Sequence, residues 1–187
     1  MAHFLDLIHA NALTRTIQES AQQPLVYRAL PRGTPLRLLL FVDAGKGDYT
    51  KAEKYPILAH ILCLAPDRED TLDGPVQLAD WRGKKSTRVG KSSLHVEALA
   101  MAGGIERRET LLGVLEEFYV RTPHLRTLLE LQEAGRYAVP LDVVTDSTSL
   151  FDLVTGAGEP KPSDEGSLLR LRWIRERVQR GSVRHMI

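Results

Sequence analysis

The chain has 187 residues, of which 43% are apolar and 26% are charged, with 25 basic and 24 acidic side chains. This length fits one domain with its own core, or one domain plus an appendage, and the composition argues against disorder, collagen and coiled coil. A formal net charge of +1 excludes a uniformly basic nucleic-acid binder but leaves room for local basic patches.

The chain contains a single cysteine, Cys63, so it forms neither an internal disulfide nor a cysteine-based zinc site. Its apolar neighbours indicate a buried small residue, which fits an intracellular protein of the cytoplasm or nucleus. The first residues lack the apolar core of a signal peptide, and the longest apolar runs are far shorter than the ~20 residues of a membrane span. We therefore expect a soluble protein with no membrane partner.

The first half of the chain is predicted to contain one helix and three strands. Residues 1–22 carry apolar side chains at spacings of three and four, which predicts an amphipathic helix, and prolines then break the pattern around a strand-like piece at 25–27. Residues 36–42 are nearly all apolar and end at Asp43, which is typical of a central strand buried on both faces. After a polar turn, further strands are predicted at 55–64 and 75–81.

The second half is predicted to alternate helices with short strands. A helix begins at Ser92 or Ser93, either of which can cap it, and Gly103-Gly104 weakens its middle before its end near Arg107. Three leading strands suggest a meander and the later alternation suggests parallel crossovers, so we predict an α/β fold with a mixed sheet flanked by helices. The remaining predicted elements are a helical region at 109–134 interrupted at Pro123, a strand at 141–145, helices at 147–154 and 167–180, and a last strand at 183–187.

Two of the predicted strands end at an aspartate, Asp43 and Asp146. If these strands are parallel neighbours, the two carboxylates lie roughly 5 Å apart at the sheet edge where α/β proteins bind ligands. Glu97 is a third candidate, because it stands in a mostly apolar stretch near the start of a predicted helix. Three clustered carboxylates raise one another's pKa unless a cation neutralises them, and ligands that are all oxygen suit Mg²⁺ or Mn²⁺.

A structural role for the same acids is the alternative. An aspartate after a strand is a common turn former, and a glutamate in a first helical turn is favoured by the helix dipole. Asp48, Asp80 and Asp142 lie in the same regions, and spacing alone does not choose among these acids.

A basic segment at 81–91 leads directly into the helix that carries Glu97. It holds five basic residues and no acid, and cations, hydroxyls and amides near a helix start suit phosphate groups, although a solvated hairpin edge is the alternative. A second basic region lies at 170–184. The candidate nucleic-acid-binding residues are Arg82, Lys84, Lys85, Arg88, Lys91, Ser92 and Ser93.

Other motifs are missing. The six histidines show no metal-ligand spacing, and neither a GxxxxGK[ST] phosphate loop nor a GxSxG elbow occurs. Trp81, Trp173 and Tyr137 are far apart in the sequence, so we expect them to pack in the core or at an edge rather than to form a base-stacking platform.

Four stretches resemble the ribonuclease H domain of copia-type retrotransposon Pol polyproteins, and they follow one another along the chain in the same order as in that family. The longest is 81–100, with the pattern W-x-x-K-K-x-x-x-V-x-x-S-S-x-x-x-E-A-L-A, which is similar to the family's strand, Ser-Ser pair and helical glutamate. The others are LLLFVDA at 38–44, VVTDSTSL at 143–150 and WIRERVQRGSV at 173–183.

The resemblance implies a ribonuclease H-like fold that cleaves the RNA strand of RNA/DNA hybrids. Asp43, Glu97 and Asp146 would then be the catalytic, metal-binding residues, holding two Mg²⁺ or Mn²⁺ ions roughly 4 Å apart. The segment 82–91 would hold the hybrid backbone. Residues 1–35 resemble the linker from a reverse transcriptase, which would make that enzyme a partner within a longer polyprotein and 36–187 the ribonuclease H-like domain.

The chain also departs from this family. Ser147 stands where an asparagine is common, a Lys-His pair and a later histidine expected before the last helix are missing, and the family's fourth acid, which follows the final strand, has no match in these residues. These departures keep a second reading open, in which the domain is C-terminally truncated or degenerate, or domesticated, and serves only as a nucleic-acid-binding or structural module. A third reading is an unrelated mixed α/β enzyme.

Overall fold

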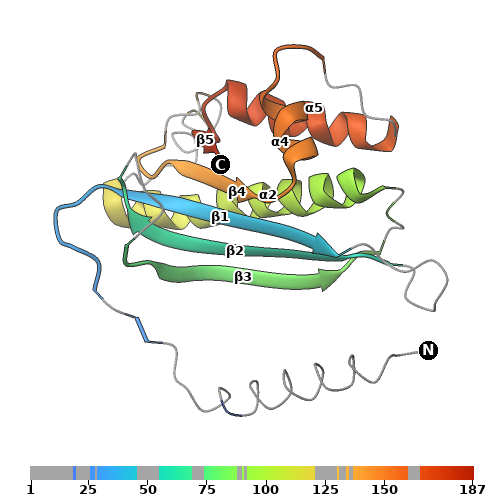
Figure 1. The fold of residues 1–187 in the computed structure, drawn as a ribbon. Helices are drawn as coiled ribbons and strands as arrows, with labels where there is room; N and C mark the ends of the chain where they lie inside the picture. The colour runs from blue at the N-terminus through green and yellow to red at the C-terminus, as the bar shows by residue number, and fades with distance from the viewer. Residues whose placement is uncertain are drawn as a thin grey trace.

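The computed structural model describes residues 19, 26–27, 29–45, 55–68, 74–87, 90, 92–120, 130, 134, 137–159 and 165–187. Its strands and helices are shown in Figure 1. In chain order they are β1 (Leu36–Gly45), β2 (Ile57–Pro66), β3 (Gln77–Lys85), α2 (Ser93–Val120), β4 (Leu141–Thr145), α4 (Thr148–Thr155), α5 (Glu165–Gln179) and β5 (His185–Met186).

The strands form one mixed sheet in the order β3-β2-β1-β4-β5. β1 pairs with β2 and β2 with β3 in antiparallel fashion, whereas β4 lies parallel to β1 and β5 parallel to β4. This arrangement confirms the predicted α/β fold class, a three-stranded meander followed by parallel strands. β1 is the central strand, between β2 and β4, and its residues Leu36–Leu40 are all buried, which is typical of an inner strand.

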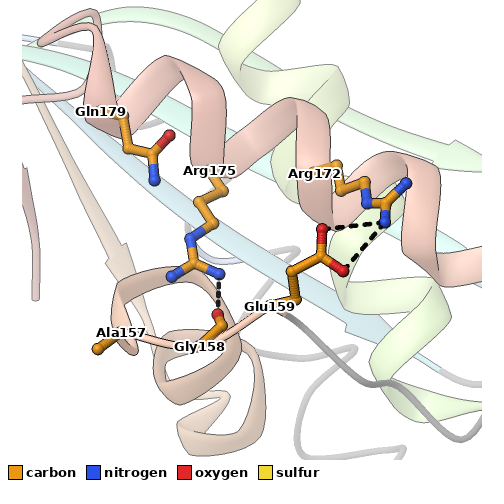
Figure 2. A pocket seen from close by; sticks show the side chains of 6 residues that line it. All are labelled: Ala157, Gly158, Glu159, Arg172, Arg175 and Gln179. Atoms are coloured by element: carbon orange, nitrogen blue, oxygen red, sulfur yellow. Dashed lines mark hydrogen bonds and ion pairs between the residues drawn. The ribbon is translucent and has the colours of Figure 1, made fainter.

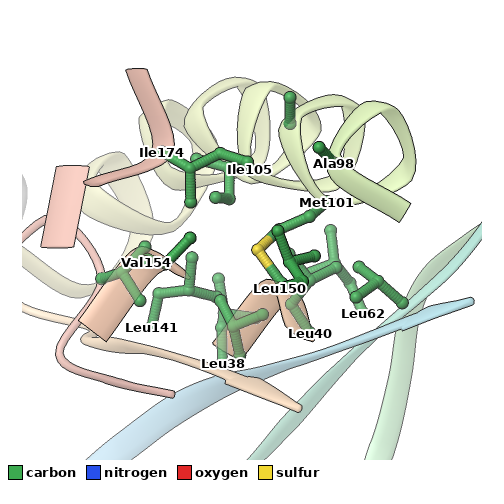
Figure 3. Packing of buried hydrophobic residues seen from close by; sticks show 14 of the residues in the cluster. Leu38, Leu40, Leu62, Ala98, Met101, Ile105, Leu141, Leu150, Val154 and Ile174 are labelled. Carbon is green, nitrogen blue, oxygen red and sulfur yellow. The ribbon is translucent and has the colours of Figure 1, made fainter. Parts of the chain in front are cut away.

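The helices cover one face of this sheet, as Figure 1 shows. Leu38 and Leu40 point from β1 into a core shared with α2, α4 and α5 (Figure 3). Val42 of the same strand belongs to this core cluster. The helix α2 lies very close to the sheet at Gly104, where an added Cβ atom would come within 2.8 Å of the Leu40 side chain. The glycine therefore allows the close approach of helix and strand.

Among the described residues, the opposite face of the meander carries far less apolar packing. Leu39, Cys63 and Ala65 form a small second cluster there, against which Leu78 packs. Cys63 is buried and free, as expected, and burial raises the pKa of its thiol. Phe41, on the same face of β1 as Leu39, is 36% exposed.

Three elements differ from the sequence prediction in ways that bear on the site, and the bounds of the other elements shift by at most two residues. β1 continues through Asp43 to Gly45, so Asp43 lies within the strand rather than after it. β3 runs from Gln77 to Lys85, so the basic segment begins on a strand. α2 is one helix of 28 residues that passes through Gly103-Gly104, because burial against the sheet outweighs the low helix propensity of glycine.

Several predictions fall outside the described residues. These include the helix predicted at 1–22, apart from residue 19, and the part of the 109–134 helical region that follows Val120, apart from residues 130 and 134. Residues 26–27 are described and belong to no strand. The proposed division into 1–35 and 36–187 stays a prediction. Within the described part of the chain, no helix is both long enough and apolar enough to cross a membrane.

Candidate metal centre

Three carboxylates converge at the carboxyl ends of the inner strands β1 and β4: Asp43 on β1, Asp146 directly after β4, and Glu97 on α2. One oxygen atom from each of Asp43, Glu97 and Asp146 lies within 4.8 Å of an oxygen of the other two. The two aspartates are exposed, whereas Glu97 is only partly accessible. Groups this close together repel one another when they are all ionised, and binding of a proton or a cation relieves this repulsion.

Strand pairing explains why the two aspartates meet. Val42 of β1 stands opposite Thr145 of β4 in the parallel register, and Asp43 and Asp146 are the next residues on each chain. Both strands run in the same direction, so both carboxylates project at the same edge. The sequence predicted this juxtaposition on condition that the strands were neighbours, and the strand order meets that condition.

Glu97 reaches the cluster from the first turns of α2. The hydroxyl of Ser92 accepts a hydrogen bond from the backbone N–H of His95 at 3.1 Å, so Ser92 is the residue that caps this helix. The His95 Nδ1 lies 3.3 Å from the hydroxyl of Ser167, which is fully buried at the start of α5. These contacts fix the turn that carries Glu97.

The carboxylate of Glu97 is poorly accommodated without a positive partner. Its Oε2 atom is buried and has no hydrogen-bond partner among the described residues. Burial, followed by the charges of Asp146 and Asp43, raises its pKa from 4.5 to about 7. An orphaned buried oxygen beside two further carboxylates fits a hard divalent cation, and the all-oxygen donor set suits Mg²⁺ or Mn²⁺.

Asp142, one of the alternative acids, has a structural role. It is fully buried, accepts a hydrogen bond from Arg37 at 3.1 Å and two from Arg184 at 3.0 and 2.8 Å. Arg184 also donates to both carboxylate oxygens of Asp67, at 2.9 and 2.8 Å. Burial alone would raise the pKa of Asp142, but the hydrogen bonds and charge of Arg184 outweigh it and the net pKa is lowered.

Asp80 is likewise occupied, and Asp48 lies outside the described residues. The Arg107 Nε donates a hydrogen bond to Asp80 Oδ2 at 2.7 Å, and this bond is the main reason that the pKa of Asp80 is lowered. The Nε2 atom of His60 lies 3.8 Å from the same oxygen. Spacing in the sequence did not distinguish Asp80 and Asp142 from the three acids of the cluster, whereas their contacts with arginines do.

The candidate nucleic-acid-binding residues do not share one face. Arg82 pairs in register with His60, and Lys84 with Leu58, and both lie on the helix-covered side of β3, whereas Lys85 alternates to the open side. All three are exposed. Ser92 and Ser93 stand at the start of α2, and Arg88 and Lys91 lie outside the described residues. The role of the set stays a prediction.

A pocket of about 340 Å³ between α5 and the segment after α4 gathers two arginines that the sequence analysis placed in the second basic region (Figure 2). Arg172 pairs with Glu159 at 3.1 Å, and Arg175 donates hydrogen bonds to the backbone carbonyls of Gly156 and Gly158. These contacts hold α5 against the segment that follows α4. The two arginines of the pocket therefore have a structural role, and we assign the pocket no ligand.

No protein-family model matches the chain, and no curated protein matches it significantly. Among solved structures, it is similar to RNase H1 from the halophilic archaeon Halobacterium salinarum NRC-1, with 12% identity, a TM-score of 0.40, and coverage of 80% of this chain and 81% of that one. LC11-RNase H1, isolated from compost by a metagenomic approach, has 10% identity and a TM-score of 0.41, with coverage of 81% and 82%. The prototype foamy virus protease-reverse transcriptase has 12% identity and a TM-score of 0.41, with coverage of 86% of this chain and 19% of that one.

Proposed function

We propose that this chain is a ribonuclease H-like nuclease that cleaves the RNA strand of RNA/DNA hybrids by two-metal-ion hydrolysis. The observation that supports it is the convergence of Asp43, Glu97 and Asp146 at the carboxyl ends of two parallel strands and the start of α2. A structural role explains this cluster poorly, because the buried Oε2 atom of Glu97 has no hydrogen-bond partner among the described residues.

The three carboxylates would hold the divalent cations. When bound, such ions lower the pKa of a water nucleophile and stabilise the charge on the leaving oxygen. The protonated carboxyl group of Glu97 would release its proton on cation binding, because the cation would supply the missing positive partner. Exposed cations of β3, among them Lys84 and Lys85, would contact the phosphates of the substrate.

The finer origin of the chain is part of the same proposal. The four stretches that resemble copia-type ribonuclease H domains favour a retrotransposon-derived protein, with 36–187 as the nuclease domain and 1–35 as a connection to a reverse transcriptase. The predicted partners are then an RNA/DNA hybrid and the reverse transcriptase portion of a longer polyprotein. The departures noted above, such as Ser147, favour the alternative of an inactive nucleic-acid-binding or structural module.

The decisive experiment measures cleavage of an RNA/DNA hybrid, labelled on the RNA strand, in Mg²⁺ and in EDTA. We expect Mg²⁺-dependent cleavage of the hybrid but not of duplex DNA. Since loss of a group that only orients a metal ligand costs 10–100-fold, Asp43→Asn should reduce the rate by at least ~100-fold. Asp152→Asn, a matched change at an exposed aspartate on α4, should leave the rate unchanged.

Each outcome separates the candidate functions. Equal cleavage by the original chain and Asp43→Asn would show that Asp43 is not part of the site that cleaves the RNA strand. Absence of cleavage, together with hybrid binding and a Mg²⁺-induced rise in melting temperature that Asp43→Asn abolishes, would favour the inactive module. Absence of both cleavage and metal-induced stabilisation would remove the metal centre itself.

A further inference from the structure

The face of the meander opposite the described helices, which we call the open face, carries a row of exposed apolar side chains that crosses three strands. Phe41 of β1, Ile61 of β2 and Trp81 of β3 stand opposite one another in register. Their exposed fractions are 36%, 47% and 62%. Residues in register on adjacent strands share a face of the sheet, so these side chains form one continuous strip.

Two hollows that share lining residues form a groove beside this strip, and Asp43 of the carboxylate cluster lines the first of them. Asp43, Ala59 and Gly83 form the adjacent row in register, and the last two have almost no side chain to fill the space above the strands. Two hollows of about 200 and 530 Å³ lie along this row, and both are lined by Ala59, His60 and Ile61. The first also contacts Asp43, and the second contacts Trp81.

The dimensions and charges of this groove favour a nucleic-acid strand. With strands ~4.8 Å apart and residues ~3.3 Å apart along a strand, the Cα atoms of Asp43 and Trp81 are separated by roughly 12 Å, a distance of a few nucleotides. Lys85 lies two residues beyond Gly83 on the open face and is exposed. Its ammonium group can neutralise a phosphate, while the indole ring of Trp81 can stack on a base.

Only an unpaired base can use this surface. Bases inside a duplex stack on one another, so their faces are not available to a side chain, whereas splayed or single-stranded bases stack on exposed aromatic rings. Trp81, for which the sequence predicted packing in the core or at an edge, lies on the edge strand β3 and leaves more than half of its surface open. It is the side chain best placed to take such a base.

We infer that the groove from Asp43 to Trp81 binds an unpaired RNA segment that continues from the scissile phosphate, with one base stacked on Trp81. This inference rests on the proposed function, because it takes the cleaved strand to pass Asp43. It gives the chain a substrate preference: hybrids whose RNA strand extends as a single-stranded tail beside the cleavage position bind more tightly than blunt hybrids.

The test uses Trp81 as its own reporter. The chain has two tryptophans, so Trp173→Phe leaves Trp81 as the only tryptophan, which can be excited apart from the tyrosines. This protein is titrated in EDTA with a blunt hybrid and with hybrids bearing a 5′ or a 3′ RNA tail. We expect a tailed hybrid of one polarity to quench the Trp81 emission, and the blunt hybrid to leave it unchanged.

Substitutions give the second readout. Stacking of one base is worth ~1–3 kcal/mol, so Trp81→Ala should weaken binding of the tailed hybrid by roughly 5- to 150-fold and leave binding of the blunt hybrid within about twofold. Trp81→Phe should restore most of the affinity, because it keeps an aromatic ring. Leu169→Ala, at an exposed apolar residue of α5, is the matched control and should change neither affinity.

Several results would overturn the inference. Equal affinities for blunt and tailed hybrids would do so, as would a Trp81→Ala protein that binds the tail normally. Acrylamide quenching of the Trp81 emission in the protein without nucleic acid gives a further test. Weak quenching would mean that other residues of the chain cover Trp81, and weak quenching only at concentrations at which the chain dimerises would mean that a second copy covers it. Either result would overturn the inference. If the protein cleaves hybrids but binds tailed and blunt hybrids equally, only this inference is refuted. If it binds tails through Trp81 but does not cleave, only the proposed nuclease activity is refuted.

Discussion

Replacing Glu97 with glutamine should stabilise the metal-free protein at high pH. The pKa of Glu97 is raised from 4.5 to about 7, first by burial and then by Asp146 and Asp43, so its ionised form is disfavoured in the folded chain. The difference corresponds to roughly 3 kcal/mol of folding free energy at a pH above 7. Glutamine has the same shape and carries no charge, so Glu97→Gln removes this cost.

The sign of the pH dependence follows from the two pKa values. Below pH 4.5 the carboxyl is protonated in both the folded and the unfolded chain, and the cost is absent. Above pH 7 it is ionised in both, and the cost is complete. The free energy of unfolding of the original chain should therefore fall relative to that of Glu97→Gln as the pH rises from 4.5 to 7.

Urea or thermal unfolding in EDTA at pH 4.5 and pH 8 measures this difference. A change of ~3 kcal/mol in a chain of this size corresponds to a shift in melting temperature of roughly 6–12 °C at pH 8. Asp43→Asn is the control, because it removes only the smallest of the three causes and should give a smaller gain. Equal differences between the original chain and Glu97→Gln at both pH values would refute the reasoning.

Two further predictions concern stability and need no metal. Asp142→Asn leaves two buried or partly buried arginines without their shared carboxylate, so it should lower the free energy of unfolding by ~3–5 kcal/mol in urea, and a loss below about 1 kcal/mol would contradict the structural role of this acid. Gly104→Ala should cost ~1–3 kcal/mol by overpacking, because the new Cβ would meet Leu40 at 2.8 Å. Gly103→Ala, where the added atom meets nothing within 4 Å, should instead gain up to ~1 kcal/mol from helix propensity, and equal melting temperatures for the two variants would count against the close helix–sheet contact.

Local sequence was sufficient for the strands that the core buries. Residues 36–42 and 141–145 are short apolar runs that contain few polar residues, and both were placed on strands that the structure confirms. Boundaries were less accurate where apolar burial stops, because β1 and β3 continue for several residues through pairing alone. The break predicted after Arg107 was wrong, since α2 is continuous from Ser93 to Val120.

The candidate site was only partly open to sequence reasoning. Glu97 stood out because an acid in an apolar stretch is costly, and the two aspartates stood out because strands end near them. Nothing in the spacing separated Asp146 from Asp142, four residues earlier. The partners of each acid decide that question, and those partners come from β1 and from the segment before β5.

The sequence by itself determined the α/β class, the buried central strand and the three acids as candidates for a metal centre, because each depends on local composition and on the period of apolar residues. Only the tertiary structure decided which acids are neutralised by arginines, and that Gly104 serves packing. It also revealed that Phe41, Ile61 and Trp81 form one exposed strip. These features join residues that are 20 to more than 100 positions apart, and strand register, which fixes such pairs, is set by the fold as a whole.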